Sequence, residues 1–149
     1  MKNLKVLLVL VLICVLLVTG CGKKNKDEGT KEQKLICTIS GPTATLTRNF
    51  TFDEEGKTLL FEEKTRLGAY SDEEILEEDY KDAQDYCVTI NEYKGVNCTA
   101  TKSAKSVKLV EKIDYTLADE QTLNVYAMTN NYSLVEMKKE AGEYGWTCK

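Results

Sequence analysis

The stretch that decides the fold runs from residue 71 to residue 101 and reads SDEEILEEDYKDAQDYCVTINEYKGVNCTAT. Its apolar residues recur at spacings of four, three, four and three, at Leu76, Tyr80, Ala83, Cys87 and Ile90. This period predicts one face of an amphipathic helix. Ser71 and Glu74 form a capping box at its start, and Gly95 is a suitable terminator. We therefore expect a helix over residues 72–94.

The segments on both sides of this helix alternate between apolar and polar residues, as half-buried strands do. Three such segments precede the helix and one follows it: residues 35–40, 44–52, 57–67 and 96–101. Threonine and phenylalanine are frequent in them, and glycine, proline or aspartate stands in the turns between the first three. We expect those three strands to form an antiparallel meander.

The C-terminal part predicts one more strand and one short helix. The strand is marked by Val107, Leu109, Ile113 and Tyr115. Ser133 and Glu136 form a second capping box, from which a helix should run to Ala141 and stop at Gly142. Residues 117–132 follow no clear period. The order of elements predicts an α+β fold: an antiparallel sheet of about five strands, with the long helix and the short C-terminal helix packed on one face.

The N-terminus has the form of a secretory leader. Lys2 and Lys5 precede 13 consecutive apolar residues, 6–18, fewer than the roughly 20 that a membrane-spanning helix needs. The run ends in Val18-Thr19-Gly20-Cys21, which resembles the lipobox of bacterial lipoproteins. The resemblance implies that the thiol of Cys21 receives a diacylglycerol and that the leader is cut before it. Cleavage would change the net charge from −4 to −6, because Lys2 and Lys5 are lost.

The chain therefore divides into three parts. Residues 1–20 are the predicted lipoprotein signal peptide, and residues 21–34 are the lipidated cysteine and its tether. The tether sequence GKKNKDEGTKEQK has no apolar residue, so we expect it to be disordered. Residues 35–149 form a single domain.

Four cysteines remain in this domain: Cys37, Cys87, Cys98 and Cys148. An even number in an exported domain indicates disulfides. If the strand after Gly95 folds back under the helix, Cys87 and Cys98 meet at the same depth, and this pairing leaves Cys37 with Cys148. Two alternatives stay open: four reduced, buried cysteines, or a zinc site, although the close spacing of a zinc ribbon is missing.

The organisation resembles the YehR-like family of small bacterial lipoproteins, whose common domain has no assigned function. The resemblance rests on the lipobox, the N-terminal meander, the acidic helix with Gly95-Val96 behind it, the strand ending in residues 112–115, and residues 138–142 in the closing helix. It implies an α+β domain with a helix on an antiparallel sheet. It supplies no catalytic residues.

The chemistry that the residues allow is narrow. The chain has no histidine, which excludes a Ser-His-Asp triad and every histidine-containing metal site. It has no G-x-S-x-G, P-loop or dinucleotide motif, and its net negative charge disfavours nucleic acid. The helix carries many acids, at Asp72, Glu73, Glu74, Glu77, Glu78, Asp79, Asp82 and Asp85. We favour a solvated acidic face over a calcium site for them.

These observations predict a non-enzymatic lipoprotein, without a cofactor, that binds an envelope protein or ligand as a monomer. It would be held on the extracytoplasmic face of the cell membrane by the lipid on Cys21, or at the outer membrane if the cell has one. The alternatives are a small carboxylate-dependent envelope hydrolase and a calcium-responsive domain. Aromatic residues crowd the C-terminal quarter, at Tyr126, Tyr132, Tyr144 and Trp146; we favour a core role for them over a binding surface.

Overall fold

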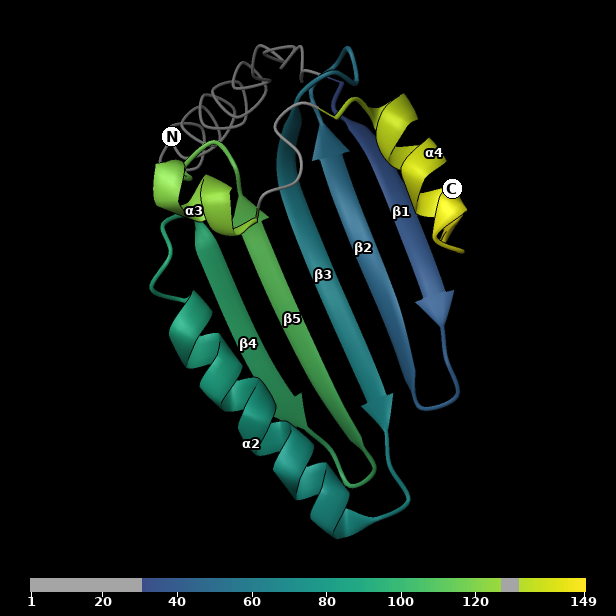
Figure 1. The fold of residues 1–149 in the computed structure, drawn as a ribbon, viewed down its shortest axis with the longest axis vertical. Coiled ribbons are helices and arrows are strands. Elements are labelled where there is room, and N and C mark those ends of the chain that lie inside the picture. Colours follow the sequence, from purple (N-terminus) through teal and green to yellow (C-terminus); the bar gives the residue numbers. More distant parts are fainter. Residues whose placement is uncertain (1–30, 127–131) are drawn as a thin grey trace, which may run out of the picture.

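The computed structural model describes residues 31–126 and 132–149, so the predicted leader, Cys21 and most of the tether lie outside the described residues. The elements follow in the order β1 (Gln33–Ser40), β2 (Ala44–Phe52), β3 (Leu59–Ala69), α2 (Glu73–Ile90), β4 (Val96–Lys102), β5 (Ser106–Asp114), α3 (Glu120–Val125), α4 (Leu134–Glu143) and β6 (Thr147–Cys148) (Figure 1). None of the described helices is long and apolar enough to cross a membrane.

The α+β class is confirmed, with one strand more than expected. The strands form one sheet in the order β4-β5-β3-β2-β1-β6, and each neighbouring pair is antiparallel. The additional strand β6 has two residues, too few to show alternation in the sequence. At the other end, β1 begins at Gln33, two residues before the predicted start of the domain at Leu35.

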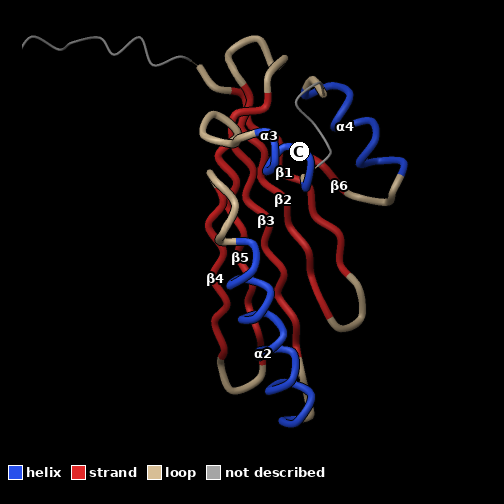
Figure 2. Tube along the Cα trace, turned by 60° about the vertical axis from the view of Figure 1, so that its left-hand side comes forward, coloured by secondary structure: helices blue, strands red, loops and turns tan. Residues whose placement is uncertain are grey.

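The strand register decides which residues share a face. Cys37, Arg48, Lys64, Glu111 and Cys98 lie opposite one another across five strands, and side chains in one such row point to the same side. Helices α2 and α4 both lie on this side: α2 along β4 and β5, and α4 along β1 (Figures 1 and 2). We call it the helix-bearing face. The packing of both predicted helices on one face is thus confirmed.

The buried core is divided between the two helices. Under α4 it consists of Leu35, Cys37, Phe50, Phe52, Leu59 and Met137. Under α2 it consists of Leu76, Ala83, Val107, Cys87, Ile90 and Cys98. The sheet between these clusters carries charged side chains instead.

Two disulfides lie near opposite edges of the sheet. Cys87 of α2 is bonded to Cys98 of β4, with their Cα atoms 5.0 Å apart. Cys37 of β1 is bonded to Cys148 of β6 at a Cα distance of 4.1 Å. This is the pairing that the spacing predicts, and it leaves no thiol among the described cysteines for zinc.

The helix ends differ from those predicted. The N-cap of α2 is Asp72 rather than Ser71, and its carboxylate accepts the backbone N–H groups of Glu74 and Ile75. The helix stops at Ile90, four residues before the predicted end. Asn91 explains this, because its amide donates to the carbonyl of Cys98 and accepts the Cys98 N–H. The turn is thereby held against β4.

In the C-terminal part, the capping box of Ser133 and Glu136 is confirmed. Gly142 does not stop α4, which continues to Glu143; the positive φ of 81° belongs to Gly145. The part of the ambiguous stretch that the structure describes contains α3, capped by Asp119. Residues 127–131 of that stretch lie outside the described residues.

Candidate binding groove

The helix-bearing face is hollowed between α2 and α4. One cavity, of about 390 Å³, is lined by residues of β2, β3 and β5 and by Trp146, which follows α4 in the chain. The strand residues include Leu46, Arg48, Lys64, Arg66 and Leu109. A second cavity, of about 380 Å³, lies against α4 and shares Arg48 and Trp146 with the first. We call the two together the groove, and the second cavity the α4 pocket.

The floor of the groove contains three ion pairs. Arg48 binds Glu62 with Nε and Nη2 at 2.6 and 2.5 Å from Oε1. Lys64 Nζ lies 3.3 Å from Glu111 Oε1. Arg66 binds both carboxylate oxygens of Asp79 in α2, at 2.8 and 3.1 Å. Glu62 and Glu111 are only 2% and 4% exposed, so these charges are held within the fold.

Each of these carboxylates also accepts a hydrogen bond from a tyrosine. The hydroxyl groups of Tyr115, Tyr86 and Tyr70 donate to Glu62, Glu111 and Asp79 at 2.9, 3.1 and 2.6 Å. Burial, together with the charge of Glu111, raises the pKa of Tyr86 to about 12. Burial opposes ionisation of Asp79, but the hydrogen bonds from Arg66 and Tyr70 still hold its pKa below the ordinary value.

This floor is ordered and electrically neutral. Each cation is matched by a carboxylate, and a second donor satisfies that carboxylate, as buried charges require. Tyr126 adds an aromatic ring 4.6 Å from Lys64 Nζ. With their charged ends engaged, the arginine and lysine side chains present their alkyl stems to the groove. The floor is therefore a fixed surface of paired charges and alkyl stems.

The α4 pocket differs from this floor. Arg48, Phe50 and Met137 line its inner side, and Glu140, Tyr144 and Trp146 line the rest. Oε2 of Glu140 is buried and has no hydrogen-bond partner among the described residues. The charge of Glu140, together with burial and a hydrogen bond between the two side chains, raises the pKa of the neighbouring Tyr132. Tyr132 thus engages this carboxylate, but its second oxygen, Oε2, finds no donor in the part of the chain that the structure describes.

The aromatic residues of the C-terminal quarter divide between the two roles considered for them. Tyr132 and Trp146 pack against the core under α4, as the core role requires. Trp146 also lines the groove, and Tyr144 is 72% exposed at its edge. The binding role therefore fits Tyr144 and one side of Trp146.

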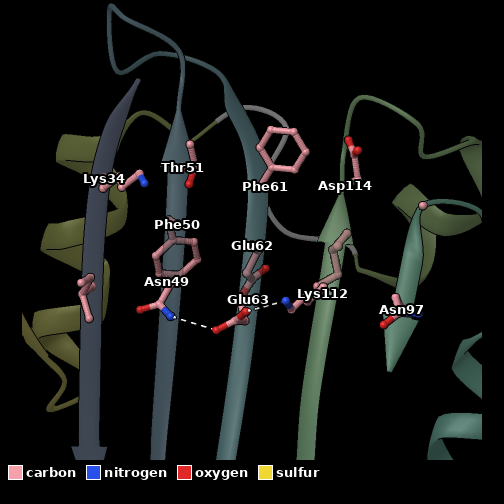
Figure 3. Close-up of a pocket in the computed structure, with 13 residues that line it drawn as sticks. Lys34, Asn49, Phe50, Thr51, Phe61, Glu62, Glu63, Asn97, Lys112 and Asp114 are labelled. Atoms are coloured by element: carbon pink, nitrogen blue, oxygen red, sulfur yellow. Dashed lines mark hydrogen bonds and ion pairs between the residues drawn. The ribbon is translucent and has the colours of Figure 1, made fainter. Parts of the chain in front are cut away.

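The opposite face of the sheet has a hollow of about 590 Å³. Figure 3 shows its polar centre, where Glu63 lies between Asn49 and Lys112, each 3.3 Å away. Phe61, 39% exposed, stands at its rim. The Lys112 and Glu63 side chains are 62% and 36% exposed, and an antiparallel sheet commonly leaves one face to water. The groove, with its buried charges, is the stronger candidate site.

The acidic residues of α2 form no metal site in the described parts of the chain, which contain no group of three or more residues able to hold a metal ion. Two of the acids have basic partners instead: Asp79 binds Arg66, and Glu77 binds Lys102 of β4. Tyr80 of the same helix lies under the Lys102 ammonium. The helix is thus fastened to the sheet partly through its acids.

Of the predicted site residues, the structure places Cys37 and Cys148 under α4 and Cys87 and Cys98 under α2, while Cys21 lies outside the described residues. The charged residues of the groove were missed. A signal was present in the strand pattern. Arg48 occupies the same alternating set of positions as Leu46, Phe50 and Phe52, and Glu111 occupies the same set as Leu109 and Ile113. A charge at an inward position of a strand marks a buried ion pair or a site.

No family model matches the chain, and no curated protein sequence matches it. Similar solved structures include the NMR structure of the Escherichia coli YehR protein, with a TM-score of 0.64 at 12% identity over 80% of this chain and 92% of that one. The NMR structure of a protein from Streptococcus pneumoniae TIGR4 has a TM-score of 0.54 at 16% identity, over 80% and 87% of the two chains. The chain thus has a YehR-like fold. At these identities the likeness concerns the fold alone.

Proposed function

We propose that this protein is a lipid-anchored, extracytoplasmic binding module that holds an envelope ligand or partner protein in the groove between α2 and α4. The groove carries the proposal: it is a concave site with an ordered, neutral floor and an aromatic wall. Ligand sites are commonly concave and mostly apolar, with a few placed polar groups. The two disulfides and the lipobox-like sequence before Cys21 support the export that this role requires.

The state of the carboxylates supports binding over hydrolysis. A hydrolase of the carboxylate type needs one acid that can give a proton and a second that can accept one. Glu62 and Glu111 are buried, as catalytic carboxylates often are, but their oxygens are already engaged. Glu62 accepts hydrogen bonds from Arg48 and Tyr115. Glu111 accepts hydrogen bonds from Lys64 and Tyr86. These contacts fix the two carboxylates in place and occupy the oxygens that a catalytic acid or base would use.

The test is a crosslinking pull-down from native envelopes with paired variants. Leu46 is 37% exposed and lines the groove, whereas Leu67 is 45% exposed on the opposite face. We expect Leu46→Arg to lose the crosslinked partner and Leu67→Arg to retain it, because only the first change places a charge in the groove. Both positions are at the surface, so both variants should fold.

Cys21→Ala serves as the control for the anchor. We expect this variant to be released from the membrane while its domain still folds, since Cys21 lies before the described domain. A partner that survives Leu46→Arg as well as Leu67→Arg would overturn the assignment of the groove. Membrane retention of the Cys21→Ala chain would overturn the lipid anchor.

A further inference from the structure

The groove contains one carboxylate more than its cations can neutralise. Arg48, Lys64 and Arg66 are matched by Glu62, Glu111 and Asp79. Glu140 of α4 also lines the α4 pocket, and among the described residues no ion pair involves it. Tyr132 contacts this carboxylate, but the buried Oε2 atom has no donor within residues 31–126 and 132–149, a state that costs free energy unless a ligand supplies the donor.

The end of α4 adds negative potential at the same place. Glu140 lies in the last turn of Leu134–Glu143, where the carbonyl groups give a helix a partial negative charge. That turn contains no basic residue. The last carbonyl groups of α4 already accept the N–H groups of Tyr144, Gly145 and Trp146. A cation beside Glu140 would therefore supply a donor to the carboxylate alone and gain only from the negative potential of the helix end.

The walls of the pocket fit an organic cation rather than a bare ion. Tyr144 and Trp146 present aromatic surface, and Met137 and Phe50 close the inner side. A cation beside aromatic rings is attracted by their faces, while its carbon chain gains from the apolar surface. Arg48 shares the pocket, but two of its guanidinium nitrogens bind Glu62 and its Cζ lies 4.9 Å from the Phe50 ring centre.

We propose that the α4 pocket binds a primary alkylammonium group, with Glu140 as its counter-ion and Tyr144 and Trp146 as its walls. The biological meaning of this assignment rests on the proposed function, since it names the chemical group by which an envelope partner is held. A primary ammonium is favoured over a quaternary one because Glu140 Oε2 has no hydrogen-bond donor among the described groups, and of these two cations only the primary one has N–H bonds to give.

The test uses Trp146, the single tryptophan of the chain, as a fluorescent reporter. The full chain in a non-ionic detergent is titrated with n-butylammonium chloride, 1-butanol and tetramethylammonium chloride. We expect saturable binding of butylammonium that is tighter than that of either comparator. Glu140→Gln should weaken it about tenfold, the value of one charge-assisted hydrogen bond. Glu143→Gln, an exposed position in the same helix, is the matched control and should leave it unchanged.

A second variant tests the walls without touching the buried carboxylate. Tyr144 is 72% exposed, so Tyr144→Ala should fold, and we expect it to weaken binding about threefold through the lost cation–π contact. Equal binding of 1-butanol, or no loss in a folded Glu140→Gln variant, would overturn the cation site. Equal binding of tetramethylammonium would overturn the primary ammonium. Because Leu46 does not line the α4 pocket, Leu46→Arg should not affect this titration, so the groove proposal and this one can fail separately.

Discussion

At the scale of single residues, Arg48 is the side chain on which the middle of the sheet depends. It is the ion-pair partner of Glu62, whose side chain is 1% exposed. We expect Arg48→Met to lower the free energy of unfolding by about 3 kcal/mol, because it leaves a buried carboxylate with no opposing charge. Methionine retains much of the apolar stem, so lost packing contributes little. Urea unfolding at pH 7 measures the change.

Lys112→Met is the matched control for this substitution. Lys112 pairs with Glu63 on the opposite face, where the two side chains are 62% and 36% exposed. Exposed pairs of this kind contribute little, so the expected change is within about 0.5 kcal/mol. Equal losses in the two variants would contradict the argument, because burial of the carboxylate is the difference between them.

The sequence predicts which residues point inward better than it predicts what they do there. Alternation places Arg48 with Phe50 and Phe52, and the structure keeps it on that face. Alternation cannot show that Glu62 lies diagonally across the next strand, because the strand register depends on pairing between distant segments. The ion pairs of the groove therefore become visible only in the folded sheet.

At the scale of elements, the sequence predicts where helices exist and less well where they end. The long helix and the capping box of α4 follow from local patterns. The early stop of α2 does not, because it depends on hydrogen bonds from Asn91 to Cys98 across the turn. Gly142 shows the opposite error: glycine is permitted inside a helix, and the residue with the positive φ lies three positions later at Gly145.

The two glycines that the sequence predicts as helix terminators should respond to alanine in opposite directions, because one precedes β4 and the other lies within α4. Gly95 has a φ of 83°, and an added Cβ would lie 2.6 Å from the carbonyl oxygen of Asp114. We expect Gly95→Ala to cost about 2 kcal/mol or more of stability through backbone strain and this clash. Thermal unfolding monitored by circular dichroism measures it.

Gly142→Ala is the comparison for this variant. Gly142 lies within α4, and an added Cβ would meet no atom within 4 Å. Alanine should raise stability by about 0.5–1 kcal/mol, because it is the better helix former. A stabilised Gly95→Ala variant would contradict the clash with Asp114, and a destabilised Gly142→Ala variant would contradict the open helical site at Gly142.

At the scale of the whole molecule, the order of the strands is the part that local patterns do not reveal. After β3 the chain forms α2 and then adds β4 at the edge of the sheet. The next strand, β5, lies between β3 and β4. The meander of β1, β2 and β3 was predictable because short turns join neighbouring strands. The place of β6 beside β1 depends on a contact between the two ends of the domain, which the cysteine count alone signalled.

The two disulfides should therefore differ in their effect on the stability of the whole domain. Cys37 and Cys148 are 111 residues apart, whereas Cys87 and Cys98 are 11 apart. On the loop-entropy model, losing the first bond costs about 5 kcal/mol and losing the second about 3 kcal/mol. Paired alanine variants, Cys37→Ala with Cys148→Ala and Cys87→Ala with Cys98→Ala, compare the two by urea unfolding.

The first pair should also raise the denaturant m-value more, because the released chain exposes more surface on unfolding. Equal losses would show that local packing, rather than loop length, determines the contribution of each bond.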